Sequence, residues 1–152
     1  MNERHGTAKG AVRAARRDGR LAELLFRVAG RLESALEAAL AEVGMSIPSL
    51  LALKHLVETG EPLPLGQLAT RIECAKSHMT QVVDRLEADG WVARVPDPGD
   101  RRSVLAELTA EGRRRYAEGL EAVRRVERDF LGRLPREERQ ALLSSLEGML
   151  EE

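Results

Sequence analysis

Leucine and valine recur every three or four positions over long stretches of this chain, which is the spacing of one apolar face on an α-helix. The first such stretch starts at Leu21 and stops at Gly44, a residue type that commonly ends helices. The pattern predicts a long amphipathic helix over this stretch. Its apolar positions are Leu21, Leu24, Leu25, Val28, Leu32, Leu36, Leu40 and Val43.

Shorter helices are expected in the middle of the chain. Ser46 can cap a second helix, which Gly60 closes, and a short extended piece is expected to follow. A third helix is expected at 67–72 and, after a break at 73–75, a fourth at about 76–89. Two short helices separated by about three residues form a helix-turn-helix pattern. The buried side of the fourth helix is expected to carry Met79, Val82, Val83 and Leu86.

A β-hairpin is expected directly after the fourth helix. Residues 91–95 are β-prone, 96–100 have turn chemistry, and 103–108 return as a second strand. Thr109 can then cap a long helix, and Pro135 suits the first turn of a last one. The pattern predicts a mainly α fold with a small β-wing, in which a winged helix-turn-helix is flanked by long N- and C-terminal helices.

Composition supports a single, mostly helical domain. The 152 residues are 43% hydrophobic but only 3% aromatic, so the core is expected to be aliphatic. No apolar run approaches the roughly 18 to 20 residues of a membrane span, and the polar start has no hydrophobic signal segment. Cys74 is the only cysteine, which excludes an intrachain disulfide and fits a reducing compartment. A soluble, cytoplasmic protein is therefore expected.

The terminal helices are expected to mediate dimerisation. Two long amphipathic helices around so small a domain leave more apolar surface than the domain can cover, which favours a second copy as partner. The alternative is that this stripe belongs to the intramolecular core. The expected organisation is a basic tail at 1–20, dimerisation helices at 21–45 and 110–152, and a winged helix-turn-helix at 46–109. The candidate dimerisation residues are Leu21, Leu25, Val28, Tyr116, Leu120, Val123, Leu143, Leu146 and Leu150.

The polar side of the fourth helix carries side chains suited to reading DNA. The formal net charge of −1 does not indicate a nucleic-acid partner, so the hypothesis depends on local geometry. Gln81 could read adenine, Lys76 could reach guanine or a phosphate, and Arg85 could bind backbone oxygens. The alternative is an ordinary solvated helix face. The candidate residues are Lys76, Ser77, His78, Thr80, Gln81 and Arg85.

The hairpin carries two adjacent guanidinium groups, Arg101 and Arg102, near its tip. Arginine is favoured in a narrow minor groove because of the enhanced negative potential there. Asp100 would repel phosphate, so its expected task is internal, either pairing with an arginine such as Arg94 or capping the turn. The candidate wing residues are Arg94, Asp100, Arg101 and Arg102.

The chain resembles the MarR family of winged-helix transcription regulators in two stretches, LGQLATRIECAKSHMTQVVDRLEADGWVARV and DPGDRRSVLAELTAEG. The likeness covers about 21–150, and the wing with the preceding DRLEADGWVAR run is its specific part. The resemblance implies a triangular homodimer on pseudopalindromic duplex DNA. The helix from Lys76 would enter the major groove, and Arg102 would probe the minor groove. It also implies a repressor, often autoregulatory, that a small phenolic or lipophilic anion releases from DNA.

Two positions depart from the family pattern. Ala75 stands where the family commonly has a serine helix cap, which would cost the helix about 1 kcal/mol. The adjacent Cys74 stands where a small aliphatic residue is typical, and we expect it to be a buried hydrophobe. The alternative is a redox-sensitive thiol beside Lys76 at a helix N-terminus.

No metal or other cofactor is expected. Cys74 and His78 could share a helical turn, but two ligands do not complete a zinc site, and His5 and His55 have no evident partners. The carboxylates are spread along helical faces, so no acid/base pair or nucleophile stands out, and no enzyme activity is expected. The remaining alternative is a winged helix that docks another protein instead of DNA.

Overall fold

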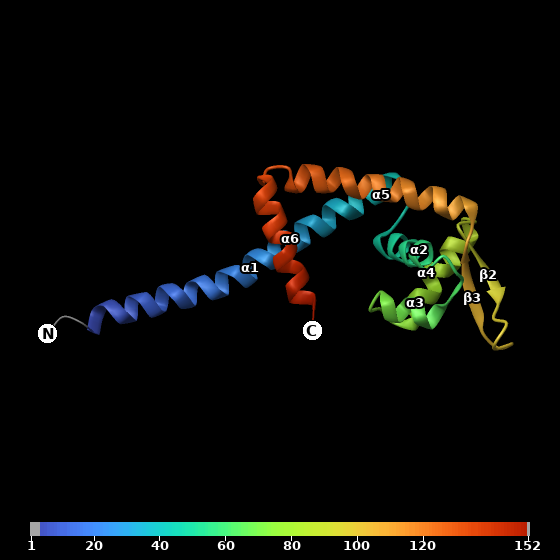
Figure 1. Ribbon diagram of the computed structural model, residues 1–152, viewed down its shortest axis with the longest axis horizontal. Helices are drawn as coiled ribbons and strands as arrows, with labels where there is room; N and C mark the ends of the chain where they lie inside the picture. Colours follow the sequence, from blue (N-terminus) through green and yellow to red (C-terminus); the bar gives the residue numbers. More distant parts are fainter. Residues whose placement is uncertain (1–3, 152) are drawn as a thin grey trace. The chain divides into compact units, whose positions relative to one another are not determined.

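The computed structural model describes the backbone of residues 4–151 and the side chains of residues 19–151. Figure 1 shows a helical fold with one small sheet. The elements are α1 (Arg4–Glu42), α2 (Ile47–Thr59), β1 (Leu63–Pro64), α3 (Leu65–Arg71), α4 (Lys76–Ala88), β2 (Val92–Pro96), β3 (Val104–Leu108), α5 (Ala110–Leu131) and α6 (Arg136–Leu150).

The chain divides into two units, Met1–Ala35 and Leu36–Glu152. The described part of the first unit is the N-terminal portion of α1, which begins at Arg4. The expected helix start at Leu21 is therefore wrong, because the alanines and arginines before it are strong helix formers. The basic side chains expected in the tail up to Arg17 lie outside the described residues, and Arg20 is exposed.

The second unit contains the winged helix-turn-helix. Its sheet is antiparallel in the order β1-β3-β2, so β3 is the central strand. Val92 pairs with Leu108 at the base of the hairpin, and Leu63 of β1 pairs with Ala106. The expected extended piece before the third helix is thus the third strand of the sheet. The largest fully buried side chains are Leu40, Leu53, Leu56, Leu68, Met79, Val83, Leu86 and Val92.

Capping residues begin α2 and α5, and end α2, where the sequence predicts. The hydroxyl of Ser46 accepts a hydrogen bond from the Ser49 N–H at 3.3 Å, and that of Thr109 accepts one from the Gly112 N–H at 3.0 Å. Gly60, with φ 71°, adopts the left-handed conformation that closes α2. At the start of α4, Ala75 offers no side-chain cap, as expected.

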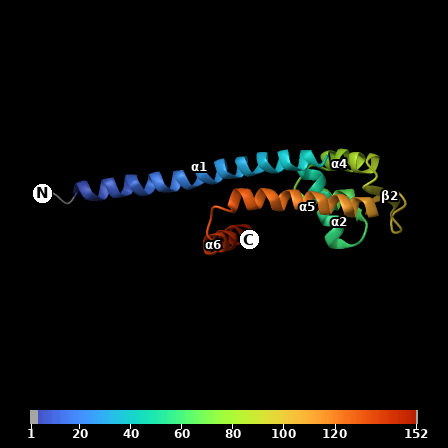
Figure 2. The same cartoon turned by 90° about the horizontal axis from the view of Figure 1, so that it is seen from above.

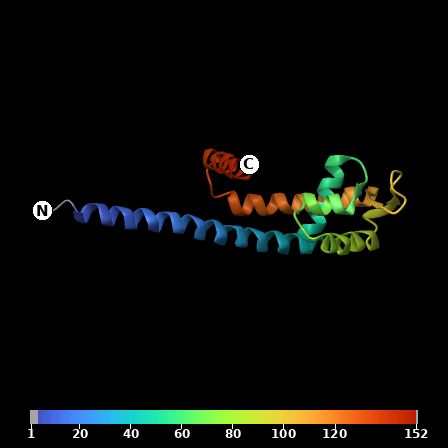
Figure 3. The same ribbon diagram turned by 90° about the horizontal axis from the view of Figure 1, so that it is seen from below.

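The two C-terminal helices meet at a sharp angle, which is visible from above (Figure 2) and from below (Figure 3). Pro135 lies immediately before α6, at its N-cap position. None of the described residues of α6 is buried, although the helix carries several large apolar side chains. Within the described residues no single helix is both long and apolar enough to cross a membrane, and only Gly19–Glu42 and α2 taken together reach that composition.

Candidate nucleic-acid interface

The α4 helix presents one polar face to solvent. Its four apolar residues are buried on the other side, which confirms the predicted orientation. Thr80 is half-buried, and its hydroxyl donates to the carbonyl of Lys76 at 3.0 Å. The structure thus places all the predicted residues on one accessible side of α4, with the Thr80 hydroxyl engaged by the helix backbone. The exposed members are Lys76, Ser77, His78, Gln81 and Arg85.

The first turn of α4 has backbone donors that no side chain caps. Ala75, the N-cap residue, has extended φ and ψ of −64° and 140° and makes no side-chain hydrogen bond. The first N–H groups of a helix have no partner within the helix, and they carry a partial positive charge. This end of α4 therefore offers N–H groups to an anion beside the ammonium group of Lys76.

The wing tip is held in shape by its two aspartates. Asp97 Oδ1 accepts from the Gly99 N–H at 2.8 Å, and Asp100 Oδ1 accepts from the Arg102 N–H at 2.9 Å. Of the two expected tasks of Asp100, capping the turn is the one observed. Arg101 and Arg102 are exposed, and within residues 19–151 no carboxylate pairs with either guanidinium. The tip of the hairpin therefore carries two positive charges without paired counter-charges in that range.

Arg94 connects α4 to the base of the wing. Its Nη2 lies 2.5 Å from Asp84 Oδ1, its Nη1 pairs with Glu87 Oε2, and its backbone N–H donates to Glu87 Oε1 at 3.3 Å. The hydrogen bond to Asp84, followed by the contacts to Glu87, raises the pKa of Arg94. The expected pairing of Arg94 with Asp100 is wrong, because Asp84 and Glu87 lie one turn apart on the side of α4 that faces β2.

Cys74 lies in the short loop before α4. It is half-buried rather than buried as expected, and its backbone N–H donates to the carbonyl of Ala69 at 3.0 Å. The loop position explains its exposure, since Glu73 turns the chain with a left-handed φ of 57°. The redox hypothesis for Cys74 stays a prediction. Among the described residues no three metal-ligating side chains lie together, and His5 lies outside them.

A cavity of about 210 Å³ lies beside the far end of α4, in the second unit. It could not be predicted from local sequence patterns, because it is formed by residues distant in sequence, between the α1–α2 turn and the α4–β2 turn. Trp91, the single tryptophan of the chain, was the one signal that could have pointed there. Arg85 belongs both to the polar face of α4 and to this cavity. The lining residues are Ala41, Gly44, Met45, Ser46, Ser49, Arg85, Asp89 and Trp91.

Comparison with known proteins identifies the family. A family model described as MarR family matches residues 45–104. The HTH-type transcriptional repressor Rv2887 of Mycobacterium tuberculosis is 32% identical over 117 residues, which cover 77% of this chain and 84% of the relative. This chain belongs to the MarR family. It is therefore a DNA-binding transcription regulator, as the resemblance implies.

Solved structures of MarR-type regulators have the same fold. A transcriptional regulator of the MarR family from Rhodococcus sp. RHA1 is 26% identical, with a TM-score of 0.77 over 87% of this chain and 93% of that chain. CouR from Rhodococcus jostii RHA1, bound to p-coumaroyl-CoA, is 28% identical, with a TM-score of 0.72 over 85% and 90% of the two chains. The predicted winged-helix fold is confirmed.

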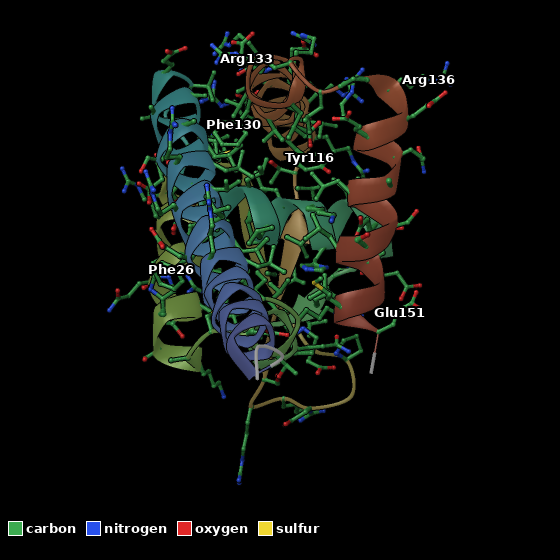
Figure 4. All side chains as sticks on the ribbon, turned by 90° about the vertical axis from the view of Figure 1, so that its left-hand side faces the viewer. Phe26, Tyr116, Phe130, Arg133, Arg136 and Glu151 are labelled. Carbon is green, nitrogen blue, oxygen red and sulfur yellow. The ribbon has the colours of Figure 1, made fainter. Side chains whose placement is uncertain are left out.

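Apolar side chains on the outer helices of this MarR-family chain are exposed. On α1, Leu21, Leu25 and Val28 are 58%, 40% and 47% exposed, and Phe26, which the sequence analysis left out, is 85% exposed. Figure 4 labels Phe26 on α1, and Tyr116 and Phe130 on α5. The predicted α5 residues Tyr116, Leu120 and Val123 are half-buried. On α6 the predicted residues Leu143, Leu146 and Leu150 are 49%, 41% and 85% exposed.

Proposed function

We propose that this regulator is a homodimeric repressor that binds pseudopalindromic duplex DNA, with α4 in the major groove and the wing in the adjacent minor groove. The observation that carries the proposal is the link between two surfaces. The polar face of α4 and the Arg101–Arg102 tip belong to elements that Arg94 ties together. One docking event can therefore engage both grooves.

The position of each residue along α4 would decide which part of the DNA it contacts. Lys76, Ser77 and His78 lie in the first turn, beside uncapped backbone N–H groups, and would hold phosphates and the nearest base edges. Gln81, one turn further, would read adenine through its amide. Arg85 lies near the far end of the helix and would bind backbone oxygens.

The wing would contribute Arg102 and Arg101 as minor-groove contacts. Both guanidinium groups are exposed at the tip, and the turn is stiffened by Asp97 and Asp100. A preformed tip loses less conformational entropy on binding. Arg94 and Asp100, the other two candidate wing residues, would act as positioning residues and not as DNA contacts.

Exposed apolar faces on α1 and α6 support a second copy of the chain as partner. Many exposed large apolar side chains on a small protein mark an interaction site, and a two-fold dimer would present two copies of α4 to two half-sites. The repressor role is supported by the relative Rv2887, which is named a repressor. Two half-sites about one helical turn apart would then form the operator.

Release from DNA would follow binding of a small phenolic or lipophilic anion. CouR, which shares this fold, binds p-coumaroyl-CoA. In this chain the cavity beside Trp91 includes Arg85, so an anion there would compete with DNA phosphates for the same guanidinium. Oxidation of Cys74, directly before α4, is a less favoured variant of the same control.

The proposal is tested by selecting bound duplexes from a random pool and measuring the affinity of Arg102→Ala at matched salt. We expect about tenfold weaker binding or more, and a salt-dependence slope smaller by about one, because one cation is lost from the interface. Arg124→Ala is the matched control, since Glu121 on α5 is the one partner of Arg124 among residues 19–151. Equal affinity of wild type and Arg102→Ala would refute the wing assignment.

A further inference from the structure

Arg115, in the second turn of α5, contacts parts of the fold that are far apart in sequence. Its guanidinium carbon lies 4.6 Å from the centre of the Trp91 ring, between α4 and β2. Its Nη2 donates to the carbonyl of Val43, just after the last residue of α1. Its Nη1 pairs with Glu118 Oε2 at 2.6 Å. One side chain thus joins the end of α1, the α4–β2 turn and α5.

The burial of this side chain is costly. Only 20% of it is exposed, and its Nε is buried with no hydrogen-bond partner within the described residues. Leaving a donor unpaired inside a protein costs free energy, and an apolar side chain of similar length would avoid that cost. The two Nη atoms and the guanidinium carbon do make favourable contacts, and an apolar side chain could not make these contacts.

On one side, Arg115 touches a junction that is already rigid. The Thr109 N–H donates to the Trp91 carbonyl at 3.1 Å, and the Thr109 hydroxyl donates to the Gly90 carbonyl at 2.7 Å. A Cβ on Gly112 would lie 2.0 Å from the same Trp91 carbonyl oxygen, so α5 approaches this turn as closely as a glycine allows. The start of α5 and the end of α4 therefore move together.

On the other side, Arg115 touches the turn that joins α1 to α2. Here Gly119 of α5 packs under Met45, where an added Cβ would lie 2.7 Å from the sulfur atom. Arg125 of α5 pairs with Glu42 of α1 at 2.8 Å. The cavity beside Trp91 opens between this turn and α4. Arg115 spans the same two turns, so a change in their separation would break one of its contacts.

We propose that Arg115 is a positioning residue that fixes α4 relative to the last turn of α1, and thereby sets the half-site spacing that the dimer accepts. The inference rests on the proposed function. A cation over a tryptophan ring and a hydrogen bond to a carbonyl both weaken when the groups move out of a limited range of distance and angle. Without it, the α4–α5 junction tilts about the α1–α2 turn, and the two copies of α4 accept a wider range of distances.

The test uses Arg115→Met, which keeps an unbranched apolar stem, and Arg114→Met as the matched control. Arg114 is the neighbouring arginine and is 58% exposed, and its partners in the described part of the chain are Glu111 and Glu118. Duplexes carry the selected half-sites with the spacer shortened or lengthened by one base pair. We expect wild type and Arg114→Met to prefer one spacing. In Arg115→Met the ratio of affinities for the preferred and the altered spacing should fall about fivefold or more, because fivefold is the lower end of the usual coupling between sites.

Two further readouts separate positioning from loss of a DNA contact or of the fold. The salt-dependence slope of Arg115→Met should equal that of wild type, because Arg115 neutralises no phosphate in this account. The fluorescence of Trp91, the only tryptophan, should shift in free Arg115→Met and stay unchanged in Arg114→Met. Arg115→Lys keeps the positive charge and disturbs packing less than Arg115→Met does. Its spacing preference should lie between those of wild type and Arg115→Met.

The outcomes distinguish the inference from the function on which it rests. A wild type that binds no duplex would overturn the proposed function and the spacing role together. A wild type with a sharp spacing preference that folded Arg115→Met shares would overturn the inference alone. If Arg115→Met does not fold, a folded Arg115→Lys with the wild-type preference would overturn it equally.

Discussion

Three arginines near the winged helix differ in what surrounds them. Arg94 has a carboxylate on each branch of its guanidinium, and Arg115 lies over an indole ring. Among residues 19–151 the guanidinium of Arg102 has no carboxylate partner, and its backbone N–H donates to the aspartate of its own turn. Arginine can hold a carboxylate, stack on an aromatic ring or insert into a nucleic-acid groove. Which of these it can do is decided by its neighbours, and in the proposed function the three arginines have different tasks.

Removing Arg94 should impair DNA binding more than folding. In Arg94→Met the carboxylates of Asp84 and Glu87 lose their counter-charge and would face phosphates, so we expect affinity to fall about tenfold or more. Both carboxylates are largely exposed, so the free energy of unfolding should fall by only about 1 kcal/mol or less. Affinity at matched salt and urea unfolding measure the two effects.

The control for Arg94→Met is the double variant with Glu87→Gln. Neutralising one of the two carboxylates should restore part of the lost affinity if their charge is the cause. A single variant that binds DNA as tightly as wild type would show that Arg94 does not position the wing.

At the scale of elements, the helices follow from periodicity and caps. Ser46 and Thr109 start α2 and α5 through their hydroxyl groups, so the sequence predicts both boundaries well. The α4 helix differs because Ala75 leaves its N-terminus uncapped. Its stability therefore depends on the packing of its buried side, and its N–H groups stay available to a ligand.

Ala75→Ser should stabilise the protein by about 1 kcal/mol, the usual value of a serine cap over alanine. The extended φ and ψ of Ala75 already suit a capping residue, so the hydroxyl can reach the first turn without backbone change. Urea unfolding measures the gain. Ala88→Ser, at the last residue of α4, is the control and should give none, since a hydroxyl there caps no N–H group. Equal stability of wild type and Ala75→Ser would contradict the assignment of this N-cap.

The parts that the sequence did not predict depend on contacts between distant elements. The two-residue strand Leu63–Pro64 is too short to carry an alternating pattern, and it exists because β3 pairs with it. The partners of Arg94 lie on α4, seven and ten residues before it in the sequence. That Arg94 pairs with these carboxylates and not with Asp100 becomes clear only from the three-dimensional structure. Arg115 reaches a carbonyl 72 residues away, which no local spacing indicates. The residues of the α4 face, by contrast, follow directly from helical periodicity.

At the scale of the whole molecule, the exposed apolar side chains of α1 and α6 are the strongest sign of an assembly. Side chains such as Leu146 and Leu150 of α6 are 41% and 85% exposed in the single chain. Burial of such surface stabilises by about 25 cal/mol per Å², so a second chain covering it gains substantial free energy. In the proposed dimer, dimerisation and DNA binding are linked, because each half-site would receive one α4.

Leu146→Glu should convert a dimer into monomers, because a carboxylate would be buried without a partner in the apolar contact. Sedimentation measures the mass. Ser144→Glu adds the same charge on an exposed α6 position away from the apolar side, and it should stay dimeric. Leu146→Glu sedimenting as a dimer would place the interface elsewhere.

The central claim, that two copies of the α4 face and the arginine wing engage one duplex together, is tested most directly by a hydroxyl-radical footprint on the selected operator. The account predicts two protected tracts related by two-fold symmetry, about one helical turn apart. It also predicts flanking minor-groove protection that disappears in Arg102→Ala. A single protected tract, or flanking protection that Arg102→Ala retains, would contradict it.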